Sequence, residues 1–242
     1  MSESRAAPLP IDWTGFDAVL FDLDGVVTPT AVIHEKAWLE LFARWDCTVE
    51  DYLAYIDGRP RYEGVATFLA SRNVRLPWGD PSDAPGDTTV CALGNRKNDT
   101  FNEVLRREGI EAYPGTTSVL DLLESAGVPS AIVSSSKNAR TVLEAAGITH
   151  RFAAIVDGNT AIEQHLAGKP DPAMFLHAGS LLNAQPGDTA VVEDAIAGVA
   201  AGSAGGFELV LGVDRTGIAD RLQAAGAHVV VHDLAETLEP AS

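Results

Sequence analysis

The chain has 242 residues, a formal net charge of −17 and only two cysteines. This length suits one large domain, or a core with a smaller domain. The negative charge argues against non-specific binding to nucleic acid or to anionic membrane surfaces, and two cysteines do not make a disulfide framework. No apolar stretch reaches the length of a membrane span, and residues 1–10 lack the apolar core of a signal peptide. A cytoplasmic protein is therefore expected.

The first predicted element is a short buried strand over the apolar run Ala18–Phe21. Two carboxylates, Asp22 and Asp24, follow it, and Gly25 allows the backbone to turn sharply behind them. One carboxylate could attack phosphorus while the other handles a proton, provided that a cation screens their repulsion. The alternative is an acidic turn without chemistry, so the motif needs support from the rest of the chain.

Helices without strands are predicted for the next segment, residues 31–109. Apolar residues recur there at helical spacing in two stretches. They are Trp38, Leu41, Phe42 and Trp45 in the first stretch, and Val65, Phe68 and Leu69 in the second. Val90–Glu108 is a third predicted helix, and residues 75–89, rich in Pro, Gly and Asp, are predicted to form a surface loop. The segment is therefore expected to be a helical insert.

From Tyr113 onward, short runs of Val, Ile and Ala alternate with helical stretches. The predicted strands are 131–133, 153–156, 190–192, 209–213 and 229–231. The predicted helices are 117–125, 139–146, 172–182, 195–201 and 218–225. Alternation of helices with continuously apolar strands predicts an α/β fold, with a parallel sheet covered by helices on both faces.

Four polar clusters follow predicted strands. The first is Asp22 with Asp24, and the second is the run 134–138, Ser-Ser-Ser-Lys-Asn. Lys169 is the third, just before the predicted helix at Pro172. Glu193 with Asp194 is the fourth. Because ligands bind at the carboxyl edge of the strands in an open parallel sheet, these clusters are expected to meet at one edge.

Each cluster suits one part of a phosphoryl-transfer site. A hydroxyl and backbone N–H groups at a helix start suit phosphate oxygens, and a lysine supplies compact positive charge. Acidic residues from two strand ends can hold Mg²⁺ through oxygen ligands. Taken singly, the serines could be helix caps, Lys169 a solvated surface lysine, and Glu193 with Asp194 a cap of the following helix. Their joint order favours the phosphoryl site.

With these four clusters the chain resembles, over essentially its whole length, the haloacid dehalogenase superfamily of phosphotransferases with a helical cap. The resemblance implies a Rossmann-like core domain, residues 1–30 and 111–242, and a helical cap domain, residues 31–110. It implies that Asp22 is the nucleophile and Asp24 the general acid/base. The phosphate-binding residues it implies are Ser134, Ser135 and Lys169. The Mg²⁺ ligands it implies are Asp22, Asp24 through its main-chain carbonyl, Asp194 and Glu193.

A closer resemblance is to the β-phosphoglucomutase family. The substrate-binding residues that it implies are His34, Trp38, Arg61, Lys97, Ser136, Lys137 and Asn138. His34 would face the cleft near Asp24, Lys97 would face the sugar, and Arg61 would bind the phosphate that is not transferred. Without the family match, His34 would be a partly buried or surface histidine, and Arg61 and Lys97 ordinary solvated charges.

Two features depart from the pattern of this family. Pro29 stands where the family usually has an acidic residue, and proline fixes φ and removes an N–H donor. The loop over residues 75–89 is longer than in the best-known members. Neither feature changes a residue expected to touch the reacting groups.

The resemblance implies Mg²⁺-dependent interconversion of β-D-glucose 1-phosphate and D-glucose 6-phosphate, through an aspartyl-phosphate on Asp22 and a sugar bisphosphate. A phosphatase that uses the same aspartyl-phosphate but admits water is the alternative. A non-catalytic sugar-phosphate-binding protein is a third interpretation. The expected partners are small sugar phosphates, with no nucleic acid and no membrane, and the chain is expected to be a monomer.

Overall fold

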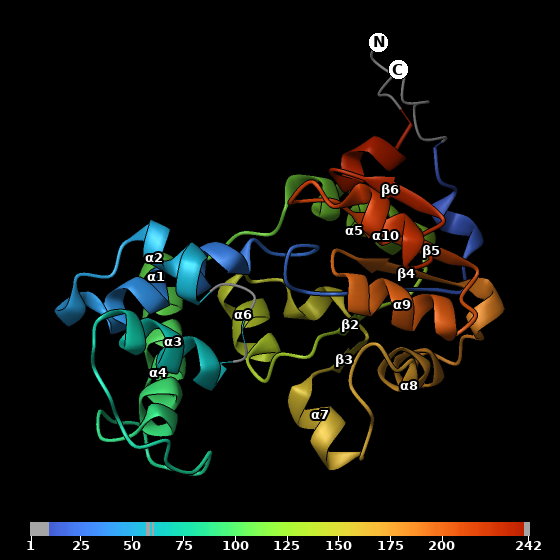
Figure 1. Ribbon diagram of the computed structural model, residues 1–242. Coiled ribbons are helices and arrows are strands. Elements are labelled where there is room, and N and C mark those ends of the chain that lie inside the picture. The colour runs from blue at the N-terminus through green and yellow to red at the C-terminus, as the bar shows by residue number, and fades with distance from the viewer. Residues whose placement is uncertain (1–9, 57–58, 60, 240–242) are drawn as a thin grey trace. The chain divides into compact units, whose positions relative to one another are not determined.

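The computed structural model describes residues 10–56, 59 and 61–239 (Figure 1). The chain forms two compact units. The core unit is Met1–Pro29 with Ile110–Ser242, and the cap unit is Thr30–Gly109. Among the described residues, none of the helices is both long enough and apolar enough to cross a membrane.

The core unit is built on one sheet of six parallel strands in the order β3-β2-β1-β4-β5-β6. The strands are β1 (Ala18–Phe21), β2 (Ser130–Val133), β3 (Ala154–Val156), β4 (Thr189–Glu193), β5 (Leu209–Val213) and β6 (Val229–Val231). In the centre, Leu20 of β1 lies beside Ala131 of β2 and Val191 of β4. Every residue of β1, β2 and β4 is buried, as expected for strands covered on both faces.

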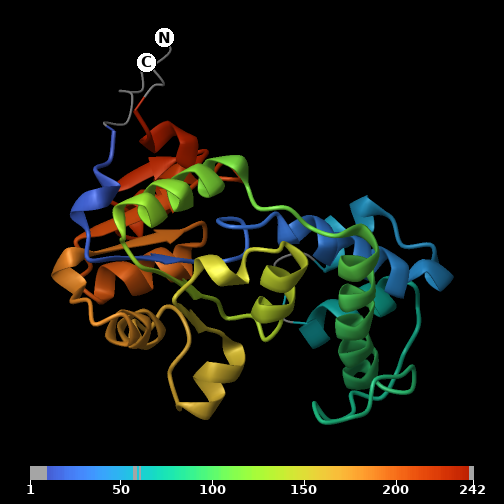
Figure 2. The same cartoon turned by 180° about the vertical axis from the view of Figure 1, so that it is seen from behind.

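Helices cover both faces of this sheet. They are α5 (Pro114–Ala126), α6 (Ala139–Ala145), α7 (Gly158–Glu163), α8 (Ala173–Leu181), α9 (Ile196–Ala204) and α10 (Ala219–Ala224). Figures 1 and 2 show α5 on one face and α8, α9 and α10 on the other. On the second face, Phe175 of α8 is fully buried with Val199 of α9 and Val210 of β5. The predicted α/β fold is confirmed.

Two predicted helices, α5 and α9, extend beyond their predicted ends, and α7 was not predicted. Helix α5 begins at Pro114, three residues before the predicted start, because proline is favoured in the first helical turn. Helix α9 continues past the predicted end at residue 201. Gly202 allows this helix to lie close to the sheet, since a Cβ there would come within 3.2 Å of methyl groups of Val191 and Val210. Helix α7 was not predicted, and Asp157 caps its start by accepting from the backbone N–H groups of Asn159 and Thr160.

The cap unit contains α1 (Thr30–Leu41), α2 (Val49–Tyr55), α3 (Arg61–Ser71) and α4 (Val90–Glu108). Its core includes Phe42, whose ring stacks on Phe68 with centroids 4.3 Å apart and on Trp38 with centroids 5.5 Å apart. Within the described part of this unit there is no strand, in agreement with the helical insert predicted from the sequence. Residues 75–89 form the predicted loop. Helix α2 was missed, although Thr48 and Asp51 form a capping box at its start.

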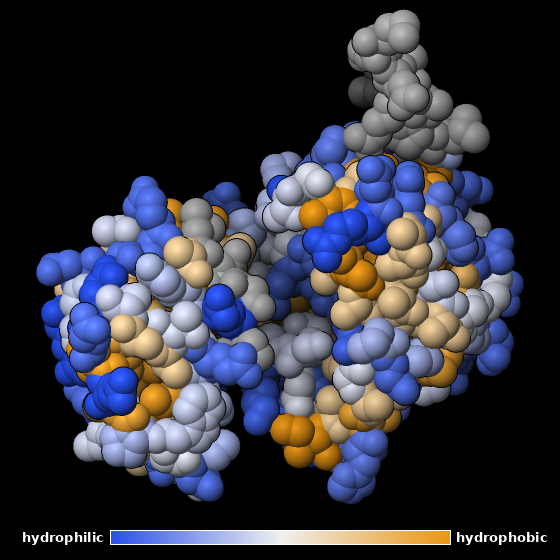
Figure 3. Space-filling model, in the orientation of Figure 1, coloured by the Kyte–Doolittle hydropathy of each residue, from blue (hydrophilic) through white to orange (hydrophobic). Residues whose placement is uncertain are grey.

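Figure 3 shows hydrophilic and hydrophobic residues mixed on the face of each unit.

Candidate active site

Lys169 lies in the core unit at the point where three strands end. Its ammonium group donates hydrogen bonds to Asp22 Oδ1 over 2.5 Å, to Glu193 Oε1 over 2.6 Å and to the Val133 carbonyl over 2.8 Å. Asp22 follows β1, Val133 ends β2 and Glu193 ends β4. The Lys169 side chain is only 7% exposed. Lys169, one of the four clusters that the sequence placed at strand ends, therefore bonds to residues of two others, Asp22 and Glu193.

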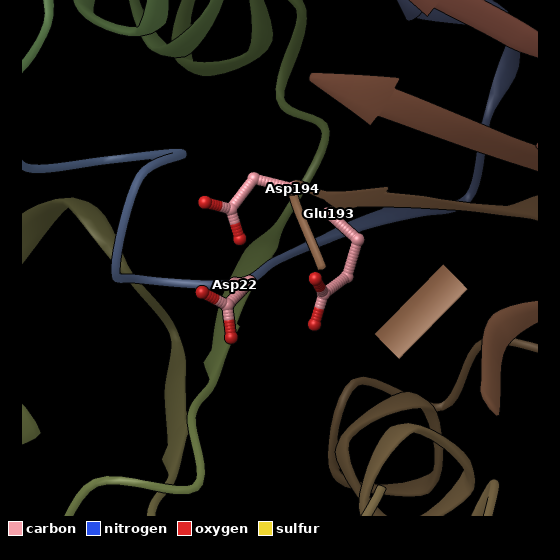
Figure 4. Close-up of side chains that lie close together, drawn as sticks. All are labelled: Asp22, Glu193 and Asp194. Atoms are coloured by element: carbon pink, nitrogen blue, oxygen red, sulfur yellow. The ribbon is translucent and has the colours of Figure 1, made fainter. Parts of the chain in front are cut away.

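Three carboxylates converge beside this lysine. Asp22, Glu193 and Asp194 each offer an oxygen, and these oxygens all lie within 4.8 Å of one another. Figure 4 shows Asp22 coming from the end of β1 and the other two from the end of β4. The main chain is tied at the same point, since the Asp22 N–H donates to the Val192 carbonyl over 2.9 Å. The parallel register of β1 and β4 thus brings the three side chains together.

Two glycines leave room for the carboxylates. Gly25 has φ of +82°, and a Cβ there would lie 1.9 Å from Asp194 Oδ2. A Cβ at residue 198 would lie 1.7 Å from Glu193 Oε1. The turn at Gly25 was predicted, whereas the role of Gly198 was missed. Its only signal in the sequence was a glycine in the first turn of the helix that follows Glu193.

The cluster has three buried or partly buried carboxyl groups and one lysine, and its excess of acidic groups affects their pKa values. Burial raises the pKa of Asp194 to about 8, and the charges of Asp22 and Glu193 add to this effect. Burial and then the charge of Asp22 also raise the pKa of Glu193, against the opposing effect of Lys169. For Lys169, burial lowers the pKa, but the charges of Asp22 and Glu193 outweigh it and the pKa is raised.

A divalent cation fits this donor set. Three carboxylates and one lysine leave the cluster negative when all are ionised. Hard oxygen donors from carboxylates are the ligands that Mg²⁺ prefers. Asp22, Glu193 and Asp194 could therefore hold Mg²⁺. The Asp24 side chain is not in this group of three among the described residues, and its main-chain carbonyl as a ligand stays a prediction.

Asp24 is half-buried in the turn after β1, where it forms an isolated bridge with Thr28. Its charge contributes to raising the pKa of Asp194. Asp24 is thus close enough to the three-carboxylate cluster to interact with it electrostatically.

The serine run after β2 forms an ordered loop. Ser134 is fully buried, and its hydroxyl oxygen accepts from the Ser136 N–H over 3.1 Å. The Ser136 hydroxyl in turn accepts from the Asn138 N–H over 3.1 Å. Ser135 and Lys137 are exposed. In both turns the serine hydroxyl oxygen acts as an acceptor, and this leaves its hydrogen able to donate a further hydrogen bond.

Residues after β3 donate hydrogen bonds to this loop. The sequence did not indicate this support. The Gly158 N–H donates to the Ser136 carbonyl over 3.1 Å, and the Asn159 side chain donates to the Lys137 carbonyl over 3.0 Å. A Cβ at residue 158 would lie 2.7 Å from the Ser135 carbonyl oxygen. An Asp-Gly pair directly after a strand was the one signal available.

In the cap unit, three of the four predicted substrate-binding residues lie together. The Lys97 ammonium contacts His34 Nδ1 and lies 5.3 Å from the centre of the Trp38 ring. The His34 ring stacks on Phe101 with centroids 4.5 Å apart. Burial, then the charges of Lys97 and Arg61, lower the pKa of His34 to about 3. His34 is therefore neutral, and Nδ1, which accepts from the ammonium, carries no proton.

Arg61, the fourth of these residues, is exposed at the start of α3. Its charge reaches His34, as the lowered pKa shows. Its expected binding of a phosphate stays a prediction. Lys97 and Trp38 are instead largely buried, which corrects the alternative of Lys97 as an ordinary solvated charge.

Comparison with known proteins gives a consistent set of relatives. The family model for haloacid dehalogenase-like hydrolases matches residues 16–206. The β-phosphoglucomutase of Mycobacterium tuberculosis is 45% identical over 238 residues, 91% of this chain and 91% of the relative. Hexitol phosphatase A of Escherichia coli is 30% identical over 193 residues, 79% of this chain and 80% of the relative. The crystal structure of a β-phosphoglucomutase from Clostridium difficile has a TM-score of 0.67 and 27% identity, and the match covers 91% of this chain and 92% of that one.

Proposed function

The chain belongs to the haloacid dehalogenase-like hydrolases, in their β-phosphoglucomutase-like family, and from this premise we propose that it interconverts β-D-glucose 1-phosphate and D-glucose 6-phosphate. The relatives support a sugar-phosphate enzyme of this superfamily. The bond from Lys169 to Asp22 within the three-carboxylate cluster supports phosphoryl transfer, and the similarity to β-phosphoglucomutase over 91% of the chain favours a sugar as the acceptor.

In this proposal Asp22 carries the phosphoryl group. A sugar hydroxyl attacks the phosphorus of phospho-Asp22, the bond from phosphorus to the Asp22 oxygen breaks, and Asp24 takes the hydroxyl proton. The product is a sugar bisphosphate. After the sugar reorients, the Asp22 carboxylate attacks its other phosphate, and Asp24 returns the proton to the leaving oxygen. Asp22 is phosphorylated again at the end of the cycle.

Positive charge is needed where the phosphoryl oxygens gather negative charge. Lys169 supplies one such charge and holds the Asp22 carboxylate in place. Asp22, Glu193 and Asp194 would hold Mg²⁺, which would supply further positive charge beside the transferring phosphate. Ser134 and Ser135 are proposed to donate hydrogen bonds to the transferring phosphate.

The cap unit is proposed to recognise the sugar and its second phosphate. His34 is neutral with its proton on Nε2, so that nitrogen can donate a hydrogen bond to the substrate. Lys97 and Trp38 lie beside it, and Arg61 supplies an exposed positive charge. With Ser136, Lys137 and Asn138 of the core unit, these residues are the proposed substrate contacts.

The experiment that tests the proposal follows both products. The protein is incubated with β-glucose 1-phosphate, Mg²⁺ and a trace of the glucose bisphosphate that primes Asp22. Glucose 6-phosphate is measured by a coupled dehydrogenase and free phosphate by a colorimetric assay. Formation of glucose 6-phosphate without matching free phosphate supports the mutase, and Asp22→Asn is the control that removes both products.

A phosphatase is the second candidate, favoured by the similarity to hexitol phosphatase A. It uses the same Asp22, Asp24 and Lys169 but transfers the phosphoryl group to water. Release of free phosphate without glucose 6-phosphate would establish this candidate and reject the mutase.

A further inference from the structure

Arg215, in the loop after β5, joins segments of the core unit that are distant in sequence. Its Nε donates to the Gly25 carbonyl over 2.9 Å. Its Nη1 donates to the His232 carbonyl over 2.8 Å and lies 3.2 Å from Asp233 Oδ2. The guanidinium carbon lies 3.8 Å from the centre of the Tyr113 ring. One planar cation therefore connects the turn after β1 with the residues before α5 and after β6.

The bond to Gly25 is the one that reaches the candidate active site. Gly25 follows Asp24, the proposed acid/base, and packs against the carboxylate of Asp194 so closely that no Cβ fits between them. A shift of the Gly25 peptide would therefore move Asp24 and open or close the space beside Asp194.

Three successive carbonyls of this turn are held from outside it. The Gly25 carbonyl accepts from Arg215, the Val26 carbonyl accepts from the Thr116 hydroxyl over 2.7 Å, and the Val27 carbonyl accepts from the Tyr113 N–H over 2.9 Å. The last two donors belong to the start of α5. The Arg215 guanidinium therefore donates to the first of these carbonyls and stacks on Tyr113, the residue whose N–H donates to the last.

The chemistry of arginine suits this position. The Arg215 side chain is 21% exposed, so its charge-assisted hydrogen bonds are shielded from most of the water. A guanidinium can donate in several directions in one plane while its face stacks on an aromatic ring. A lysine has one charged nitrogen and cannot make the stacked and the separate in-plane contacts together.

We propose that Arg215 is a positioning residue for phosphoryl transfer, which holds the turn carrying Asp24 against Asp194 through the Gly25 carbonyl. The inference rests on the proposed function of the carboxylate cluster. The four contacts of Arg215 are with Gly25, His232, Asp233 and Tyr113, and none of them is with the three-carboxylate cluster.

The test compares Arg215→Gln and Arg215→Lys with Arg221→Gln, an exposed arginine on α10 that serves as the matched control. Steady-state kinetics are measured well below the melting temperature at saturating Mg²⁺. Hydrogen–deuterium exchange of residues 22–28 and calorimetric Mg²⁺ affinity are measured without substrate, so they do not depend on turnover.

For Arg215→Gln we expect kcat to fall about tenfold or more while KM changes about twofold or less, because misplaced catalytic groups weaken the transition state more than substrate binding. Exchange of residues 22–28 is expected to rise more than in the rest of the sheet, with weaker Mg²⁺ affinity. Arg215→Lys is expected to keep only part of the wild-type kcat. In one further variant, Arg215→Ala, added methylguanidinium is expected to restore activity. Arg221→Gln is expected to match the wild type.

A merely structural role predicts a different set of results. The melting temperature would fall and exchange would rise throughout the core unit, while kcat below the transition stayed at the wild-type value. That result, or unchanged exchange of residues 22–28 in Arg215→Gln, would overturn the inference and leave the proposed function intact. If the wild type transfers no phosphoryl group, the proposed function fails instead, and exchange and Mg²⁺ affinity still decide whether Arg215 holds the turn.

Discussion

The ammonium group of Lys169 lies 2.5 Å from Asp22 Oδ1 and is the buried counter-charge of the proposed nucleophile. The same nitrogen bonds to Glu193 and to a main-chain carbonyl at the end of β2. Its side chain also lies over Phe175, whose ring centre is 4.9 Å from Nζ. Lys169 therefore contributes both a positive charge and packing contacts to the carboxylate cluster.

Replacement of Lys169 by methionine is expected to destabilise the protein. Methionine keeps the length of the side chain, but Asp22 and Glu193 then lose their buried counter-charge. Removing one partner of a buried ion pair costs about 3–5 kcal/mol. Urea unfolding without metal measures this loss, and added Mg²⁺ is expected to recover part of it because the cation replaces the missing charge.

The control for this variant is Lys36→Met, which breaks an exposed ion pair with Glu108 in the cap unit. Exposed pairs contribute little, so this variant is expected to unfold close to the wild-type urea concentration. Equal losses in the two variants would show that Lys169 is not an important counter-charge of the cluster.

The sheet and the strand-end clusters were predictable because their signals are local. A fully buried parallel strand is a continuous apolar run, as in Ala18–Phe21, and the polar residues that follow it mark the carboxyl edge. The sequence therefore indicated that Asp22, Lys169 and Glu193 lie at one edge. It could not indicate their pairing, because the distances depend on how neighbouring strands are aligned.

The features that were missed depend on contacts between distant segments. Gly198 is required because α9 passes close to Glu193, and Gly202 is favoured because the same helix lies close to Val191 and Val210. Arg215 has the appearance of a surface charge until its bond to Gly25, 190 positions away in the sequence, is known. Such requirements arise from tertiary packing, which overrides local propensity.

Binding of Mg²⁺ is expected to release protons near neutral pH. The pKa of Asp194 is raised to about 8, so in the metal-free protein this carboxyl is mostly protonated at pH 7. A carboxyl group must lose its proton to bind the cation, so binding displaces up to about one proton from Asp194, and affinity rises with pH toward pH 8. Calorimetry at pH 7 in buffers of different ionisation enthalpy measures the number of protons released.

Asp194→Asn is the matched control for proton release. Asparagine keeps an oxygen ligand but cannot bind a proton in this range, so the variant is expected to bind Mg²⁺ more weakly and to release fewer protons. The same number of protons in both proteins would show that Asp194 is not the group that ionises.

Gly198→Ala is expected to weaken Mg²⁺ binding, although the substitution adds only one methyl group. The new Cβ would lie 1.7 Å from Glu193 Oε1, so the carboxylate must move away from Lys169 and from the other two carboxylates. We expect about a tenfold or greater loss of Mg²⁺ affinity, of the size seen when groups that orient metal ligands are changed. Gly187→Ala is the control, because no atom lies within 4 Å of a Cβ at that residue. Equal Mg²⁺ affinity in the two variants would contradict the role assigned to Gly198.

Acid is expected to weaken the cap unit through His34. Its pKa falls from the ordinary 6.5 to about 3 in the folded protein, chiefly because the ring is buried. Between these two values the unfolded chain binds more protons than the folded one, so stability rises with pH from about 3 to 6.5 and is complete above that. From pH 7 to pH 5 this effect removes about 2 kcal/mol. Urea unfolding followed by tryptophan fluorescence measures this loss of stability, since Trp38, Trp45 and Trp78 lie in the cap unit.

Two variants test whether His34 is the source of this effect. His34→Gln keeps an acceptor for Lys97 but has no group that binds a proton in this range, so its urea midpoint should fall less between pH 7 and pH 5. The exposed control His150→Gln should follow the wild type. Parallel pH curves for His34→Gln and the wild type would show that His34 is not the source of the acid sensitivity.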